Sequence, residues 1–412
     1  MDDPMLPVPH RRPPPMRAIE TVLLASTACL LAAVAWPIAS GSVTSAAPSE
    51  PVVAAPLAPF PAAESPTIQI AILLDTSSSM DGLIDQARGR IWSVVNSLDS
   101  ATLHGAKPRF EVALYEYGND RIDGSAGHLR RVVGFTPELD SVSRALFSLT
   151  TNGGSEFAPL AIDRALDELE WRGGDGVIRV VYVAGNESFD QGPAAWRQVL
   201  AEAKERGVVV NAIYCGREED YDATLWRDAA GFGGGRFFAI DQNQIAAYVP
   251  APQDEEIARL GSAINETYIP YGRDGLEGHA NQMKQDDNNE MLGMSSVVDR
   301  TLTKSSSYYR NPSWDFVDAV DENAVDLDSI DREALPEPLR GLGREGLAAH
   351  VAARKAERAA IQERLSALRT EREAFLADPA NGAAPEAQGL DSAMITALHE
   401  HARASGFSID PR

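Results

Sequence analysis

Cysteine is scarce in this sequence, since the 412 residues include two, Cys29 and Cys215. A framework of disulfides is therefore excluded as the basis of the fold. The seven histidines are scattered, and neither an HExxH nor a CxxC spacing occurs, so the sequence gives no support to a zinc site. Cys215 ends an apolar segment typical of a buried strand, and we expect its thiol to be a small core group.

Basic residues are in deficit, because 37 Lys and Arg stand against 60 Asp and Glu and give a formal net charge of −23. This balance argues against a nucleic-acid partner, which needs a basic surface facing its phosphates. It also argues against docking of the folded part on anionic lipid. We expect the acidity to serve solubility rather than to form an acidic binding face.

Motifs of common enzymes are missing as well. The sequence has no G-x-x-x-x-G-K-[ST] phosphate loop, and Gly153-Gly154-Ser155 does not match the G-x-S-x-G pattern of a nucleophilic serine. The acid runs Glu218–Asp220 and Asp286–Asp287 lie in polar stretches, where we expect solvated side chains. The sequence therefore predicts a protein that is not an enzyme, with a hydrolase of unrecognised residues as the weakest hypothesis.

The N-terminus carries a pattern typical of export. Three arginines precede the uncharged run 21–36, and small residues follow it. The run is shorter than the about 20 residues that a membrane span needs, so residues 1–42 are predicted to be a signal peptide, or alternatively a retained signal-anchor. Residues 43–66 are rich in Pro and Ala and are predicted to be an extended linker. We expect a periplasmic or secreted body, with membrane contact only through an uncleaved N-terminal segment.

Apolar segments that alternate with helical patterns follow from residue 67. The segments 68–75, 177–184 and 208–215 are nearly unbroken apolar runs, which is typical of buried strands in a parallel sheet. Residues 67–250 are therefore predicted to form a doubly wound, mostly parallel α/β sheet with helices on both faces. Ligand sites of such sheets lie at the carboxyl ends of the strands, and Asp75 lies at one of these ends.

The remainder of the chain is predicted to be mainly helical. Residues 251–343 are polar and irregular, with a possible helix near 288–303, and are expected to pack on the sheet domain or to be tethered to it. Residues 344–412 are predicted to form a long charged helix followed by a short one. Three arginines interrupt the heptad pattern of the long helix, which leaves two alternatives, a coiled-coil dimer or a helix that folds back on its own chain.

Aromatic residues gather in the segment 304–320, which is otherwise rich in Ser and Asn. The rings of this segment, Tyr308, Tyr309, Trp314 and Phe316, are expected to pack it against the sheet domain. The alternative is a recognition patch on the surface.

The loop at Asp75 has the pattern D-x-S-x-S, directly after a buried strand and before a helix. In an extended loop Ser77 and Ser79 point the same way, so their hydroxyls can ligate one ion while the Asp75 carboxylate supplies charge. Mg²⁺ prefers such oxygen ligands and keeps several waters. The structural alternative is a serine-rich turn in which Ser79 caps the following helix.

The segment DTSSSM after IQIAILL resembles the metal ion-dependent adhesion site of the von Willebrand factor A family. Residues 67–410 resemble a group of bacterial proteins of this family with undefined function, on segments such as AGNESFDQGP and KSSSYYRNPSWD. The resemblance implies binding of Mg²⁺ or another divalent cation. It also implies a protein ligand that completes the metal site with an Asp or Glu side chain.

Two further loops contribute ligands in this family. Ser155 stands where the family has a Thr, with Thr151 as a substitute if the loop register differs. The Asp that the family has after its central strand is absent here, and Gly185 or Asn186 occupies that position. Glu187, or Glu156 beside Ser155, could compensate for the missing acid, although we expect both to be solvated loop acids. The predicted metal ligands are Asp75, Ser77, Ser79, Ser155 and Asn186.

These observations favour an exported binding protein that captures a protein partner at a divalent cation. The alternative hypothesis is a structural or assembly protein in which the sheet domain is a degenerate scaffold and the C-terminal helices drive oligomerisation.

Overall fold

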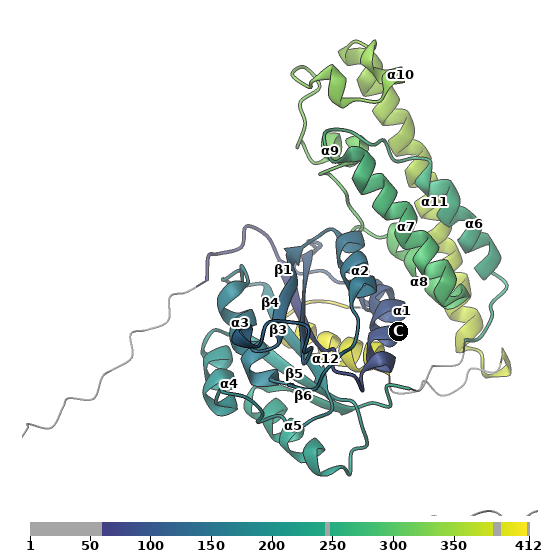
Figure 1. Ribbon diagram of the computed structural model, residues 1–412. Coiled ribbons are helices and arrows are strands. Elements are labelled where there is room, and N and C mark those ends of the chain that lie inside the picture. Colours follow the sequence, from purple (N-terminus) through teal and green to yellow (C-terminus); the bar gives the residue numbers. More distant parts are fainter. Residues whose placement is uncertain (1–59, 244–247, 382–388, 410–412) are drawn as a thin grey trace, which may run out of the picture. The chain divides into compact units, whose positions relative to one another are not determined.

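A computed structural model describes residues 60–243, 248–381 and 389–409. The predicted signal segment and most of the predicted linker lie outside these residues. Six strands form one sheet in the order β3-β2-β1-β4-β5-β6, with β3 antiparallel and the other neighbours parallel (Figure 1). The strands are β1 (Thr67–Asp75), β2 (Arg109–Tyr117), β3 (Leu129–Thr136), β4 (Val177–Gly185), β5 (Val209–Tyr214) and β6 (Gly234–Ala239).

Helices cover both faces of this sheet, which confirms the predicted fold class. The residues of β1 show the two faces, because Ile70 and Ile72 pack in one core and Ala71 and Leu73 in the other. This alternation follows from the period of two in a strand that is buried on both sides. The first core includes helices α1 (Asp81–Ser97), α2 (Leu139–Ser148) and α12 (Leu390–Ala404), and the second includes α3 (Ala158–Glu168), α4 (Trp196–Glu205) and α5 (Tyr221–Phe232).

The last helix, α12, returns to the sheet from the far end of the chain. It contacts α1, β4, β5 and β6. The hydroxyl of Tyr182 on β4 donates a hydrogen bond to the Met394 carbonyl at 2.9 Å. A helix from the end of the sequence thus completes one of the two layers over the sheet.

The region between β6 and α12 is helical, as predicted. Its helices are α6 (Asp254–Asn265), α7 (Gly275–Leu292), α8 (Met294–Lys304), α9 (Phe316–Asp321), α10 (Glu337–Arg340) and α11 (Arg344–Ala377). The residues predicted to be helical near 288–303 belong to two helices instead of one, because Gly293 separates α7 from α8. Gly293 has φ +106° and ψ 176°, a conformation that favours glycine and breaks the helix.

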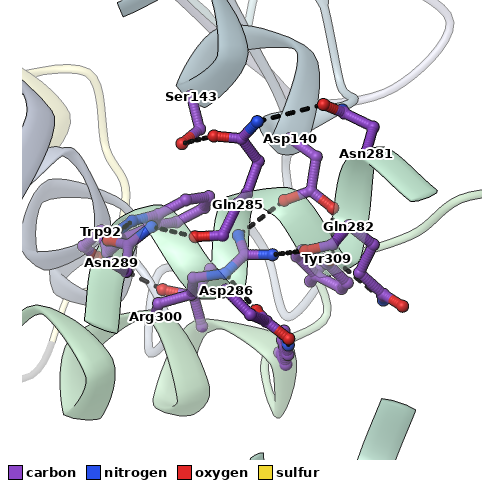
Figure 2. A network of polar contacts seen from close by, with 12 residues as sticks. Trp92, Asp140, Ser143, Asn281, Gln282, Gln285, Asp286, Asn289, Arg300 and Tyr309 are labelled. Atoms are coloured by element: carbon purple, nitrogen blue, oxygen red, sulfur yellow. Dashed lines mark hydrogen bonds and ion pairs between the residues drawn. The ribbon is translucent and has the colours of Figure 1, made fainter. Parts of the chain in front are cut away.

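Buried charges join this helical region to the sheet domain (Figure 2). Arg300 of α8 is 2% exposed and donates to Asp140 of α2 at 2.6 Å and to Asp286 of α7 at 2.5 Å. Lys304 donates to both Asp286 carboxylate oxygens at 2.6 and 2.7 Å, and Trp92 of α1 donates to the Asn289 side chain at 2.8 Å. The prediction that Asp286 is a solvated acid is therefore wrong, since it neutralises two buried cations.

The long helix α11 folds back on its own chain, which favours the second of the two alternatives for this segment. It contacts α6, α8 and α9. Its apolar side chains Leu347, Val351, Leu365 and Leu368 are buried in cores of the same chain. Arg358, which interrupts the heptad pattern, is also buried and donates hydrogen bonds at 2.9 Å to Asp315 and at 2.9 Å to Asp318.

The aromatic segment is buried, but only part of it packs on the sheet domain, since Phe316 packs on Tyr271 of the helical region. Tyr308 packs on Phe110 of β2 with ring centroids 5.7 Å apart, and its hydroxyl donates to the Leu98 carbonyl. The Tyr309 hydroxyl donates to Asp140. Trp314 packs on Tyr268 within the helical region, with ring centroids 5.6 Å apart. Among the described residues, no helix is long and apolar enough to cross a membrane.

Candidate metal centre

The loop after β1 begins with a fully buried carboxylate. Asp75 ends β1 between β2 and β4, and its Oδ1 accepts a hydrogen bond from the Ser77 backbone N–H at 2.7 Å. The hydroxyls of Ser77 and Ser79 lie 3.2 Å apart, so the two alternate residues face the same side of the loop. Ser77 is buried and Ser79 is exposed. The three residues of the D-x-S-x-S pattern therefore run from the core to the surface.

A second loop, between α2 and α3, is fastened to the first by backbone hydrogen bonds. The N–H of Asn152 donates to the Thr76 carbonyl at 2.9 Å, and the N–H of Ser78 donates to the Gly153 carbonyl at 3.1 Å. The Ser78 hydroxyl accepts from the N–H of Gly153 at 3.0 Å. These bonds place the residues that follow Gly153 beside Asp75.

Glu156 of this second loop lies against Asp75. It is 5% exposed, and its carboxyl contacts the side chains of both Asp75 and Ser77. Burial, together with the neighbouring Asp75 carboxyl, raises the pKa of Glu156 to about 9. The expectation of a solvated loop acid is therefore wrong for Glu156, because the loop turns this side chain inward.

Two carboxylate oxygens of this pair have no hydrogen-bond donor. They are Oδ2 of Asp75 and Oε2 of Glu156, and both atoms are buried. A buried carboxylate oxygen without a donor carries a large desolvation cost, which a cation or a shared proton would remove. The residues present therefore fit a hard divalent cation held by carboxylate and hydroxyl oxygens.

The third loop follows β4 and reaches the exposed end of the site. The Asn186 side-chain amide donates to the Ser79 hydroxyl at 3.1 Å. Gly185 has no space for a side chain, because a Cβ atom there would lie 2.5 Å from the Tyr117 hydroxyl. Glu187 is exposed, so it remains the solvated acid that the sequence predicts.

The predicted ligand Ser155 and its substitute Thr151 lie outside the group of hydrogen-bonded side chains around Asp75. Thr151 donates to Asp81 at the start of α1, which engages its hydroxyl away from Asp75. Ser155 is half-buried directly before Glu156. Within the described part of the chain, no hydrogen bond joins Ser155 to Asp75 or Ser77. The structure thus brings Asp75, Ser77, Ser79 and Asn186 into one connected group and leaves Ser155 beside it.

The side chains of this group that could ligate a metal ion are of several chemical types. Among the described residues, no set of three or more His, Cys, Asp and Glu side chains is arranged to hold a metal ion. The site instead combines two carboxylates with serine hydroxyls and one amide. Sequence reasoning considered Glu156 but did not include it among the ligands. Its position next to the predicted ligand Ser155 was the one sign in the sequence that Glu156 could reach the metal site. Its burial follows from contacts between loops, which the sequence does not reveal.

Comparisons with known proteins identify the sheet domain. Residues 69–245 match the family model of the von Willebrand factor type A domain. No protein in a search of curated proteins matches the chain.

Several solved structures are also similar. One is an aerotolerance-related membrane protein from Bacteroides fragilis NCTC 9343, at 16% identity over 43% of this chain and 93% of that one, with a TM-score of 0.32. A second is proximal thread matrix protein 1 from the mussel byssus with a zinc-occupied MIDAS motif, at 15% identity over 44% of this chain and 43% of that one, with a TM-score of 0.35. A third is the SpRpn10 VWA domain, at 15% identity over 42% of this chain and 88% of that one, with a TM-score of 0.33.

Proposed function

We propose that this chain, which carries a von Willebrand factor type A domain over residues 69–245, captures a protein partner through a divalent cation. The observation that carries the proposal is the pair of buried carboxylate oxygens without a donor, on Asp75 and Glu156, beside the Ser77 hydroxyl. This donor set suits Mg²⁺ or another hard divalent cation.

The position of the site supports the binding of a partner. The site opens at the carboxyl edge of the sheet, where the loops after β1 and β4 meet through the contact between Ser79 and Asn186. Asp75, Ser77, Ser79, Ser155 and Asn186 are the proposed ligands on three loops. A partner's Asp or Glu side chain would then complete the coordination sphere from the exposed end.

Export is part of the same proposal. It is supported by the basic residues, the uncharged run and the small residues of the N-terminus. The body would then lie in the periplasm or the medium, or be held at the membrane by the N-terminal segment if that segment is retained.

Calorimetric titration of Mg²⁺ into the purified chain tests the cation directly. We expect saturable binding that is lost in Asp75→Ala, because this substitution removes the central carboxylate. Asp85→Ala is a matched control, since Asp85 is an exposed acid on α1 and its removal should leave binding unchanged. Absence of binding up to about 10 mM Mg²⁺ would contradict the proposal.

A second candidate function, assembly with further copies of the chain, is favoured by exposed apolar side chains. They lie on α7 and at the start of α8 and are Leu276, Met283, Met291, Leu292 and Met294. Exposed apolar surface on a soluble protein often marks an interface. Light scattering on the parent chain and on a Leu276→Gln, Met291→Gln variant tests this candidate. A monomer mass for both at high concentration would exclude it.

A further inference from the structure

We infer that Glu156 is the second carboxylate ligand of the cation site and takes the place of the acid that the turn after β4 lacks. This inference rests on the proposed function, because it names a further ligand of the same cation.

The contacts of Glu156 support this role. Its carboxyl lies against Asp75 and also contacts Ser77, so three oxygen-bearing side chains converge on one point. Gly118 makes this convergence possible. A Cβ atom on Gly118 would lie 2.6 Å from Oδ1 of Asp75 and 3.0 Å from Cγ of Glu156, and its φ of +81° also favours glycine.

The turn after β4 has no room for the acid that Glu156 replaces. At position 185 a side chain would collide with the Tyr117 hydroxyl, which is fixed by a 2.8 Å hydrogen bond to the Ala184 carbonyl. The ring of Trp226 lies 3.2 Å from the same Cβ position. Asn186 is neutral and its amide is engaged with Ser79. The second negative charge must therefore come from another loop, and Glu156 is the buried acid that reaches the site.

The charge balance of the pair also supports this role. Two adjacent buried carboxyls cannot both carry a negative charge without a counter-charge, and each here keeps one oxygen without a hydrogen-bond partner. A divalent cation between them offsets the repulsion and satisfies both oxygens at once. The two carboxylates then balance the charge of the ion, and the hydroxyls complete its protein ligands without adding charge.

The experiment compares two substitutions that each replace a carboxyl group by an amide of the same shape. Mg²⁺ is titrated calorimetrically into the full chain, into Glu156→Gln and into the control Glu187→Gln, whose exposed side chain lies in the turn after β4. We expect Glu156→Gln to weaken Mg²⁺ binding at least about tenfold, because even the loss of an outer-shell partner of a metal ligand has an effect of that size. Glu187→Gln should weaken it less than about threefold, since an exposed charge acts only through screened attraction.

Thermal melting separates loss of a ligand from loss of the fold. Without metal, Glu156→Gln should melt no lower than the parent chain, because one of two adjacent carboxyls is gone. The rise in melting temperature that Mg²⁺ produces in the parent chain should be absent in this variant. Equal Mg²⁺ affinity of Glu156→Gln and the parent chain, with binding still lost in Asp75→Ala, would overturn the inference and leave the proposed function intact. Absence of binding by the parent chain would overturn both.

Discussion

The sheet domain and the helical region differ in the kinds of side chain that they bury. In the sheet domain the centre is apolar, and β1 contributes Ile68, Ile70 and Ile72 to one core and Ala71 and Leu73 to the other. In the helical region charged side chains are buried beside the apolar ones. Arg300, Lys304 and Arg358 are all buried there, each beside at least one carboxylate.

This difference has an energetic consequence. Apolar burial is non-directional and tolerates small rearrangements. A buried ion pair adds little net stability, but the loss of one partner leaves an uncompensated charge in a low-dielectric interior. The helical region should therefore be fixed in one geometry and should be sensitive to the loss of single charges.

The largest effect is expected for Arg300→Ala. This substitution leaves the carboxylates of Asp140 and Asp286 without their shared cation and removes the contact of the guanidinium with the Trp92 ring. We expect a loss of about 3–5 kcal/mol in the free energy of unfolding, measured by urea denaturation. Ile70→Ala gives the corresponding value for the apolar sheet, where about 2–5 kcal/mol is expected. A loss below about 1 kcal/mol for Arg300→Ala would remove the proposed contrast.

A pair of arginines one turn apart on α11 gives the next effect. Arg358 is buried against Asp315 and Asp318, whereas Arg354 forms an exposed pair with Glu357. Arg358→Ala should lower the free energy of unfolding by about 3 kcal/mol, since two buried carboxylates lose their partner. Arg354→Ala should change it by less than about 1 kcal/mol. Similar losses for the two variants would show that the burial of Arg358 is unimportant for stability.

The smallest of the three effects is the loss of unfolding free energy that acid causes by protonating Asp286. Burial acts to raise the pKa of Asp286, but the charges of Lys304 and Arg300 outweigh burial and lower the pKa to about 2. The unfolded chain has an ordinary value of about 3.9. Folding therefore favours the carboxylate, and its contribution is fully present above about pH 4 and is lost as the pH falls through about 2.

We expect this contribution to be about 2 kcal/mol, measured as the change in unfolding free energy between pH 4 and 2. Asp286→Asn should lack this part of the acid dependence. Asp287→Asn is the matched control, because Asp287 is the exposed neighbour on the same helix. If the control loses the same acid dependence, Asp286 is not its source.

The contrast between the two regions also explains how much of the fold was predictable from the sequence. Buried strands of a parallel sheet leave unbroken apolar runs, so β1, β4 and β5 were placed within one or two residues. In α7 the buried face includes Gln282, Gln285 and Asn289, so no apolar stripe marks it. The helix α5 was missed, and so was the break at Gly293, which a glycine in a polar stretch does not reveal.

The candidate site likewise has a part that the sequence predicts and a part that it does not. Asp75, Ser77 and Ser79 are close in sequence, and their spacing after an apolar strand suffices to place them together. Glu156 comes from a loop that is distant in sequence. Its burial depends on the hydrogen bonds of Asn152 and Gly153 and on the space at Gly118, and these become visible only in three dimensions.

One measurement tests the cation site most directly. Crystals of the chain grown with Mn²⁺, which replaces Mg²⁺ at oxygen sites, would show the ion by its anomalous scattering. We predict a peak within about 2.0–2.3 Å of a carboxylate oxygen of Asp75 or Glu156, with the Ser77 and Ser79 hydroxyls facing it. A map without a peak between Asp75 and Glu156 at millimolar Mn²⁺, with the two carboxyls joined by a hydrogen bond, would contradict the account.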